Sequence, residues 1–378
     1  MSNNKDFLKA FNKAFSKNGT DAARKASDPQ AYKGEVIEFP SLTLGDASHY
    51  WGLPLGKITQ FHGPEGCGKT FFAMLMVKQA QDKYPGSSVV WFDAEYSFNE
   101  TWAKNLGIDT DRLVIVPENN AAVIFTMICG RSNDQGKKID LGILDHVGGK
   151  TLDCKLIVLD SIANLIYPIE ENRGFDEQEM AAGARFLMKG MKRTTPMLAE
   201  TGTSFLCINQ AREKIGERIP TLTYPGGRPY RHTLSLAVLF KASGSKDGQI
   251  QSENERKQGH KILATVEKTR AGPDKWKSEF WLDFSKGVVN RGAEAAMLGD
   301  AYGIISRPNA VTWIYEDLTV KGKDAFAAAL EARPDLVEKL IAHIQEIKTS
   351  GNGRPAVLSE DDTGPVSDFE VGDSGEVA

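Results

Sequence analysis

The sequence contains no run of about 18 apolar residues, the length that a membrane-spanning helix requires. Its opening segment, MSNNKDFLKAFNKAF, also lacks the long apolar stretch of a secretory signal peptide. We therefore expect no membrane partner and a cytoplasmic location.

Cysteine and histidine are both scarce. Cys67, Cys129, Cys154 and Cys207 are scattered without the spacing of a zinc site, and the six histidines form no H-x-x-x-H pair. Two of the cysteines lie in apolar, strand-like segments, which indicates buried, reduced thiols. The sequence therefore predicts no structural metal beyond any Mg²⁺ that arrives with a nucleotide.

An excess of basic charge is also absent, since 46 Lys and Arg stand against 50 Asp and Glu, for a formal net charge of −4. The whole-chain charge does not indicate nucleic-acid binding, and any such site has to be local, because net charge averages over patches. The 378 residues allow one large domain with appendages, or two domains.

The most informative stretch is GPEGCGKT at residues 63–70, which has the spacing G-x-x-x-x-G-K-T. Residues 57–61 before it alternate like a buried strand, and residues 71–81 after it are apolar at helical spacing. This is the context of a phosphate-binding loop, in which glycine backbone N–H groups and the helix N-terminus face phosphate oxygens. A glycine-rich turn before a helix is the weaker interpretation. The expected nucleotide-binding residues are Gly63, Pro64, Glu65, Gly66, Cys67, Gly68, Lys69 and Thr70, with Lys69 on the β- and γ-phosphates and Thr70 on Mg²⁺.

Three further strands end in polar side chains that a nucleotide hydrolase needs. Asp160 ends the apolar run 156–161 and has the placement of a Walker B acid, which holds Mg²⁺. Glu95 ends strand 88–95 and is suited to orient or deprotonate the attacking water. Gln210 ends strand 204–210 and can hydrogen-bond the γ-phosphate. Singly, each residue can also be a helix cap or a solvated strand end, but together they favour a catalytic site.

Strands that alternate with helices predict an α/β fold with a doubly wound, mostly parallel sheet that turns antiparallel toward its end. Further strands are expected at residues 113–116, 234–240, 261–267 and 279–284, and helices at residues 100–106, 121–129 and 180–198. Residues 130–155 are rich in glycine and charge and are predicted to be an irregular insertion or a hairpin.

Composition divides the chain into four parts. Residues 1–34 are predicted to be a linker and, over residues 5–25, an amphipathic N-terminal helix that packs either on a partner, as an oligomerisation helix, or on its own core. Residues 35–292 are predicted to be an ATPase core. Residues 293–348 are expected to be a small C-terminal α+β region with two helices split at Pro334. Residues 349–378 carry acids without interspersed bases from Glu360 onward and are predicted to be a disordered tail.

Four runs in this order resemble the core of the RecA recombinase family: GPEGCGKT (63–70), FDAE (92–95), IVLDSIA (157–163) and INQAREKIG (208–216). LPLGKIT (53–59) and VEKTRAGP (266–273) extend the similarity, which covers about residues 35–284. The resemblance implies a RecA-type P-loop ATPase core that uses ATP and Mg²⁺.

The resemblance also implies roles for single residues. Glu95 is similar to the family's catalytic carboxylate, and Gln210 to the residue that links the γ-phosphate to the second DNA-binding loop. Asn99 and Trp102 fall where family members contact adenine. Lys268 and Arg270 resemble two basic residues that serve ATP bound to the neighbouring subunit; a solvated strand end is the alternative for them.

Two segments resemble the family's DNA-binding loops. The first, residues 169–180, leads into a helix with basic side chains, and the second, residues 212–232, interleaves Arg and Tyr with glycine, which suits single-stranded DNA. A solvated surface loop is the alternative for the second. The candidate DNA-binding residues are Arg185, Lys192, Arg193, Arg212, Lys214, Arg218, Gly226, Gly227, Arg228, Tyr230 and Arg231.

Some features depart from the family pattern. The second loop differs in sequence and contains Pro220, Pro225 and Pro229, Cys67 replaces a small hydroxyl residue, and the C-terminal region is not recognisable. Such divergence is expected of a phage-encoded or otherwise distant member, located in a bacterial cell or a phage-infected host.

The leading hypothesis is an ATP-dependent recombinase that forms a filament on single-stranded DNA and exchanges strands with a homologous duplex. ATP is expected at subunit interfaces, and a single-strand binding protein and a loader are further expected partners. Two alternatives share the core: a hexameric DNA motor such as a helicase, and a signalling ATPase that does not bind DNA. Closed rings would indicate the motor, and absent oligonucleotide binding would indicate the signalling protein.

Overall fold

The computed structural model describes residues 9, 11–14, 34–168, 179–213, 222–223, 225, 230–245, 248–251 and 257–350. The chain divides into two units, Met1–Val36 and Ile37–Ala378. In the first unit, residues 11–14 are helical, and most of the helix predicted over residues 5–25 lies outside the described residues, as does the predicted acidic tail after residue 350. None of the described helices combines the length and the apolar character that crossing a bilayer requires.

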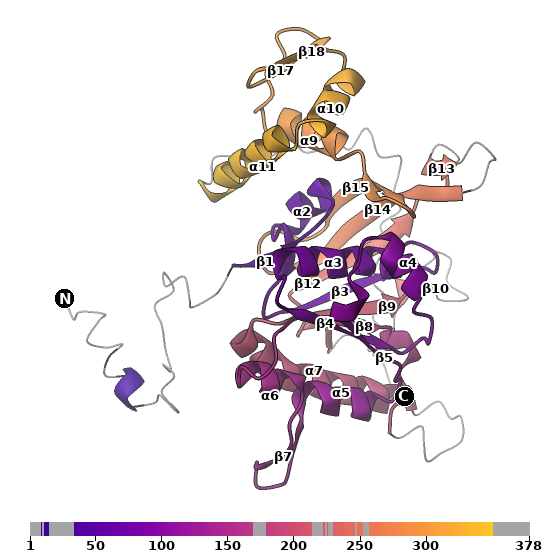
Figure 1. The fold of residues 1–378 in the computed structure, drawn as a ribbon, viewed down its shortest axis with the longest axis vertical. Coiled ribbons are helices and arrows are strands. Elements are labelled where there is room, and N and C mark those ends of the chain that lie inside the picture. The colour runs from indigo at the N-terminus through magenta and orange to yellow at the C-terminus, as the bar shows by residue number, and fades with distance from the viewer. Residues whose placement is uncertain are drawn as a thin grey trace, which may run out of the picture. The chain divides into compact units, whose positions relative to one another are not determined.

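The second unit is built on a ten-stranded sheet with the order β16-β15-β14-β12-β3-β9-β8-β4-β5, to which β13 adds by pairing with β14 (Figure 1). The six strands from β12 to β5 are parallel, and β14, β15 and β16 are antiparallel. This confirms the predicted doubly wound sheet that turns antiparallel at one side. The bounds are β3 Ile58–Gly63, β4 Ser88–Asp93, β5 Leu113–Val116, β8 Cys154–Asp160, β9 Ser204–Gln210, β12 Leu236–Ala242, β13 Gln249–Gln251, β14 Lys257–Thr269, β15 Trp276–Asp283 and β16 Gly287–Val289.

Helices cover both faces of this sheet, which is why its central strands are apolar without interruption (Figure 1). In β4, Trp91 points into one core and Phe92 into the other, because successive strand residues face opposite sides. The first core packs against α3 (Lys69–Lys83) and the second against α5 (Ala121–Cys129), α6 (Ile143–Gly148) and α7 (Glu179–Thr201). The four cysteines are free and buried.

Two short helices were not predicted. The first is α2 (Leu42–Ser48), whose N-terminus is capped by Ser41. The second is α6, which follows the hairpin of β6 (Arg131–Ser132) and β7 (Lys138–Asp140). The segment at residues 130–155 therefore contains a hairpin, which was one of the two predicted possibilities, followed by a helix and the start of β8. Figure 1 shows the hairpin projecting beyond α5 and α7.

The C-terminal region has a core of its own, centred on Trp313, Phe326 and Leu340. It contains α9 (Arg291–Ala301), the hairpin of β17 (Thr312–Tyr315) and β18 (Leu318–Lys321), α10 (Lys323–Glu331) and α11 (Pro334–Thr349). The two last helices are divided just before Pro334, as predicted, because proline is favoured at the first helical position. The proposed domain boundaries stay a prediction.

A buried carboxyl joins α9 to the N-terminus of α2. One oxygen of Glu294 accepts hydrogen bonds from Ser41 Oγ (2.7 Å) and from the Thr43 backbone N–H (2.8 Å) and hydroxyl (2.9 Å). Burial raises the pKa of Glu294 from 4.5 to about 7, although these hydrogen bonds lower it. The folded chain thus favours the neutral acid.

We expect this carboxyl to make stability depend on pH. Because its pKa is higher in the folded state, its stabilising effect is complete below pH 4.5 and is lost as pH rises through about 7. The loss amounts to about 3 kcal/mol. Urea unfolding of wild type and Glu294→Gln at several pH values will measure it: relative to the variant, wild type should lose stability between these limits. Parallel pH profiles would contradict this prediction.

Candidate nucleotide-binding site

The loop between β3 and α3 has a backbone that only glycine accommodates. A Cβ atom on Gly63 would lie 2.1 Å from the carbonyl oxygen of Phe240, and Gly68 has a φ of 85°. Gly68 is the N-cap of α3 and supplies no side-chain hydrogen bond, so the first backbone N–H groups of the helix are available to an external acceptor. A phosphate is the natural acceptor at such a helix end.

Lys69 is the first residue of α3 and is only 7% exposed. Its ammonium group donates to the carbonyl oxygens of Gly63 (3.0 Å) and Pro64 (2.6 Å) and lies 3.7 Å from Cys67 Sγ. Burial raises the pKa of Cys67, more than the nearby Lys69 lowers it, so the thiol is neutral. The loop thus concentrates one positive charge beside the helix N-terminus.

An acidic side chain faces this charge from the end of β8. Thr70 Oγ1 donates to Asp160 Oδ2 (2.9 Å), while Asp160 Oδ1 is buried and has no hydrogen-bond partner in the described part of the chain. Burial, followed by the charge of Glu95, raises the pKa of Asp160 to about 7. A divalent cation would supply the positive charge that the Asp160 carboxylate lacks beside it. Hydroxyl and carboxylate oxygens are the ligands that Mg²⁺ prefers. The two residues therefore fit Mg²⁺.

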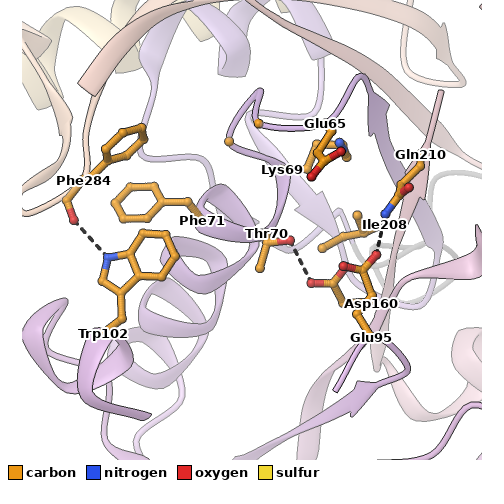
Figure 2. A pocket seen from close by; sticks show the side chains of 12 residues that line it. Glu65, Lys69, Thr70, Phe71, Glu95, Trp102, Asp160, Ile208, Gln210 and Phe284 are labelled. Carbon is orange, nitrogen blue, oxygen red and sulfur yellow. Dashed lines mark hydrogen bonds between the residues drawn. The ribbon is translucent and has the colours of Figure 1, made fainter. Parts of the chain in front are cut away.

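Glu95 is held by hydrogen bonds from two sides. Its Oε1 accepts from Gln210 Nε2 (2.7 Å) at the end of β9 and from Ser161 Oγ (2.7 Å) just after β8. Ser161 was not predicted, although its place next to Asp160 at a strand end is a signal. Figure 2 shows Glu95, Asp160 and Gln210 converging on the loop, and they line one cavity of about 250 Å³ with Lys69 and Thr70.

The other end of the cavity is aromatic (Figure 2). Trp102 Nε1 donates to the carbonyl oxygen of Phe284 (3.0 Å), and its ring centroid lies 5.1 Å from that of Phe71. Asn99 does not line the cavity; its side chain caps α4 (Glu100–Asn105) by accepting from the Trp102 backbone N–H (2.9 Å). A flat, apolar wall of this kind suits a nucleobase, and Asn99 positions the residue that builds it.

Lys268 and Arg270 lie at the opposite edge of the sheet. Lys268 pairs with Ala237 near the start of β12, which itself pairs with the start of β3, whereas the phosphate loop follows the end of β3. Burial, then the charges of Arg270 and Arg231, lowers the pKa of Lys268 to about 8. In the folded unit these cations therefore lie toward the side of the sheet where β3 starts, away from the phosphate loop at the end of β3.

A family model described as the RecA N-terminal domain matches residues 5–289. The chain belongs to the RecA family. It is similar to Protein RecA of Thermus thermophilus, at 30% identity over 344 residues, which are 90% of this chain and 92% of that protein. It is also similar to Protein RecA of Cytophaga hutchinsonii (30% over 347 residues; 90% and 89%) and of Fusobacterium nucleatum (29% over 354 residues; 92% and 85%).

The residues expected to bind DNA, as the RecA family resemblance implies, fall into four groups. Arg185, Lys192 and Arg193 are exposed on α7. Tyr230 is fully buried and its hydroxyl accepts from Asn209 Nδ2 (3.1 Å), so it has no surface to offer DNA, and we correct its assignment to a structural one. Six further candidates lie outside the described part of the chain: the side chain of Arg212, and the residues Lys214, Arg218, Gly226, Gly227 and Arg228. Arg231 forms an ion pair with Glu267 (2.8 Å).

Proposed function

We propose that this chain is an ATP-dependent DNA recombinase that coats single-stranded DNA as a filament and pairs it with a homologous duplex. Membership of the RecA family supports this function. The observation that carries it is the hydrogen bond of 2.7 Å between Gln210 and Glu95. It joins the carboxylate suited to hydrolysis to Gln210, which lies two residues before the second candidate DNA-binding segment, residues 212–232.

Nucleotide binding would use the groups gathered at the end of β3. The backbone N–H groups of the loop and Lys69 would hold the triphosphate, with the ammonium exchanging its two carbonyl partners for phosphate oxygens. Thr70 and Asp160 would hold Mg²⁺, which when bound supplies positive charge to the phosphate oxygens. Trp102 and Phe71 would face the base.

Hydrolysis would begin when Glu95 orients a water molecule and accepts its proton. The water oxygen bonds to the γ-phosphorus as the bond to the β–γ bridging oxygen breaks, which yields ADP and phosphate. A γ-phosphate oxygen competes with Glu95 for the Gln210 amide, so nucleotide state would shift Gln210 and the segment after it. Lys268 and Arg270 of a neighbouring copy would stabilise the developing negative charge, because they lie away from their own loop.

The proposed partners are single-stranded DNA, a homologous duplex and further copies of this chain. A single-strand binding protein and a loader stay predictions, as does the cytoplasmic location. The acidic tail, residues 349–378, is proposed to compete with DNA for basic segments because it is a polyanion.

The deciding experiment measures ATP turnover with and without single-stranded DNA and images the assembly formed with a slowly hydrolysed ATP analogue. A recombinase should show strong stimulation by DNA and open helical filaments. Closed rings alone would support a motor, and no binding of oligonucleotides with or without ATP would overturn both DNA hypotheses.

Removal of the aromatic wall should weaken nucleotide binding more than catalysis. Trp102→Ala is expected to raise the KM for ATP roughly tenfold with little change in kcat, because the ring contacts the base in ground and transition states alike. Trp102→Phe keeps a ring beside Phe71 and serves as the matched control. An unchanged KM in Trp102→Ala would show that the base binds elsewhere.

A further inference from the structure

One carboxylate oxygen connects two strands of the sheet, β3 and β14, to the turn that leads into β12. Oε2 of Glu267 lies 3.1 Å from His62 Nε2 and 2.8 Å from an Arg231 guanidinium nitrogen. His62 directly precedes Gly63 of the phosphate loop, Glu267 directly precedes Lys268, and Arg231 lies near the end of the second candidate DNA-binding segment, residues 212–232. The contact therefore joins three functional elements that lie far apart in the sequence.

A β-bulge makes this contact geometrically feasible. The register between β12 and β14 shifts between Ala237 and Val238, and Glu267 is the extra residue of β14 at that point. His62 belongs to β3, on the other side of β12, and its side chain reaches Glu267 across that strand. Bulges redirect side chains in this way.

The contact is largely removed from water. The side chains of His62, Glu267 and Arg231 are 1%, 24% and 21% exposed. Burial by itself would raise the pKa of Glu267, but the hydrogen bond and charge of His62, together with Arg231, lower it below its ordinary value. A partly buried carboxylate that keeps its charge between a guanidinium and an imidazole nitrogen holds both side chains in place, and both lose this contact when the carboxylate is removed.

A second set of hydrogen bonds holds the same segment to the candidate catalytic cations. Lys268 Nζ donates to the backbone carbonyl of Arg231, and the Arg270 guanidinium donates to that of His232. On its other side the segment is linked to β9, because Asn209 donates to the Tyr230 hydroxyl and accepts from the Gln210 backbone N–H (3.0 Å). Residues 230–232 thus lie between Gln210 and the two cations.

We propose that Glu267 is a positioning residue that fixes residues 230–232 against the phosphate-loop strand and thereby sets Lys268 and Arg270 for the nucleotide of the neighbouring copy. This inference rests on the proposed filament with ATP at the interface. DNA bound to the segment before Tyr230 would act on the cations through the same contacts, which provides a route from DNA binding to ATP turnover in the adjacent protomer.

The test measures how a substitution of Glu267 changes ATP turnover in the neighbouring subunit, and not in the chain that carries the substitution. The Glu95→Gln protein, called the carrier, is expected to coat DNA without hydrolysing ATP. A trace of wild-type protein is mixed with a large excess of this carrier, so that nearly every wild-type chain has carrier subunits as neighbours. The ATP turnover of the mixture then comes from wild-type sites that face carrier subunits. We expect normal turnover per wild-type chain in the Glu95→Gln carrier. In the carrier Glu95→Gln/Glu267→Leu it should fall about tenfold or more, since small misplacements of catalytic groups have effects of this size.

Three further carriers make the result decisive. Glu95→Gln/Glu279→Gln removes a carboxylate of β15 that pairs with Lys261, and should behave like the plain carrier. Glu95→Gln/Glu267→Gln keeps an acceptor oxygen and should restore part of the turnover. Glu95→Gln/Lys268→Ala tests the neighbour's cation itself. Filter binding confirms that each carrier still coats DNA, which a misfolded protein does not.

The outcomes separate the inference from the function on which it rests. Loss of turnover with both the Glu267→Leu and the Lys268→Ala carriers supports the positioning role. Loss with Lys268→Ala but normal turnover with Glu267→Leu overturns the inference and leaves the filament mechanism intact. Normal turnover with both overturns the shared interface site, and the positioning role with it.

Discussion

Replacing Lys69 by alanine should abolish nucleotide-dependent DNA binding. The ammonium group is the one buried cation at the loop in the described part of the chain, and it already spans the carbonyl oxygens of Gly63 and Pro64, where phosphate oxygens would compete for it. Charge-assisted hydrogen bonds to phosphate are roughly twice as strong as neutral ones, so we expect ATP affinity to fall at least about a hundredfold.

Two measurements check this result. A fluorescent ATP analogue reports nucleotide affinity, and filter binding of a labelled oligonucleotide with a slowly hydrolysed analogue reports assembly. Lys78→Ala is the matched control, because Lys78 lies on the same helix, α3, and makes only a partly exposed i,i+4 pair with Asp82. Nucleotide-dependent DNA binding that survives in Lys69→Ala would refute the assignment of the loop.

Replacing Glu95 by glutamine should separate binding from turnover. The amide oxygen can still accept from Ser161 and Gln210, so the site should keep its shape and bind ATP. An amide cannot take the proton of the attacking water, and loss of a general base lowers kcat by about 10² to 10⁴. Because hydrolysis is proposed to release the filament, DNA should also dissociate more slowly.

Single-turnover ATP hydrolysis and the dissociation rate from a labelled oligonucleotide test this prediction together. Glu100→Gln is a suitable control, since Glu100 is an exposed carboxylate on α4 that pairs with Lys104. Turnover close to wild type in Glu95→Gln would assign the general base to another group. Weak ATP binding would instead show that the charge of Glu95 is needed before chemistry begins.

Short-range patterns predicted most of the fold and the centre of the site. Continuous apolar runs identified β4, β8 and β9, because strands covered on both faces need no alternation. Glu95, Asp160 and Gln210 are predicted to be site residues because each lies at the end of such a run, and the ends of parallel strands meet at one edge of a sheet. Their convergence on the phosphate loop therefore follows from topology.

Single polar or aromatic residues in loops were less predictable. Tyr230 and Arg231 are adjacent in a basic, glycine-rich segment, yet one is fully buried and the other is paired to Glu267. Asn99, which is predicted to contact adenine, caps the helix that carries Trp102, and its contact with adenine stays a prediction. Composition indicates that a segment can contact DNA or a nucleotide, but it does not say which side chain turns inward.

The order of strands and motifs, the phosphate loop and the strand-end acids were determined by the sequence itself, because each depends on residues that are close along the chain. Only the tertiary structure decided that Lys268 and Arg270 lie at the edge opposite their own loop, and that His62, Arg231 and Glu267 meet at one oxygen. Those relations depend on the register of β3, β12 and β14 and on one bulge. Packing of side chains from distant segments sets that register, so it cannot be predicted from residues that are close along the chain.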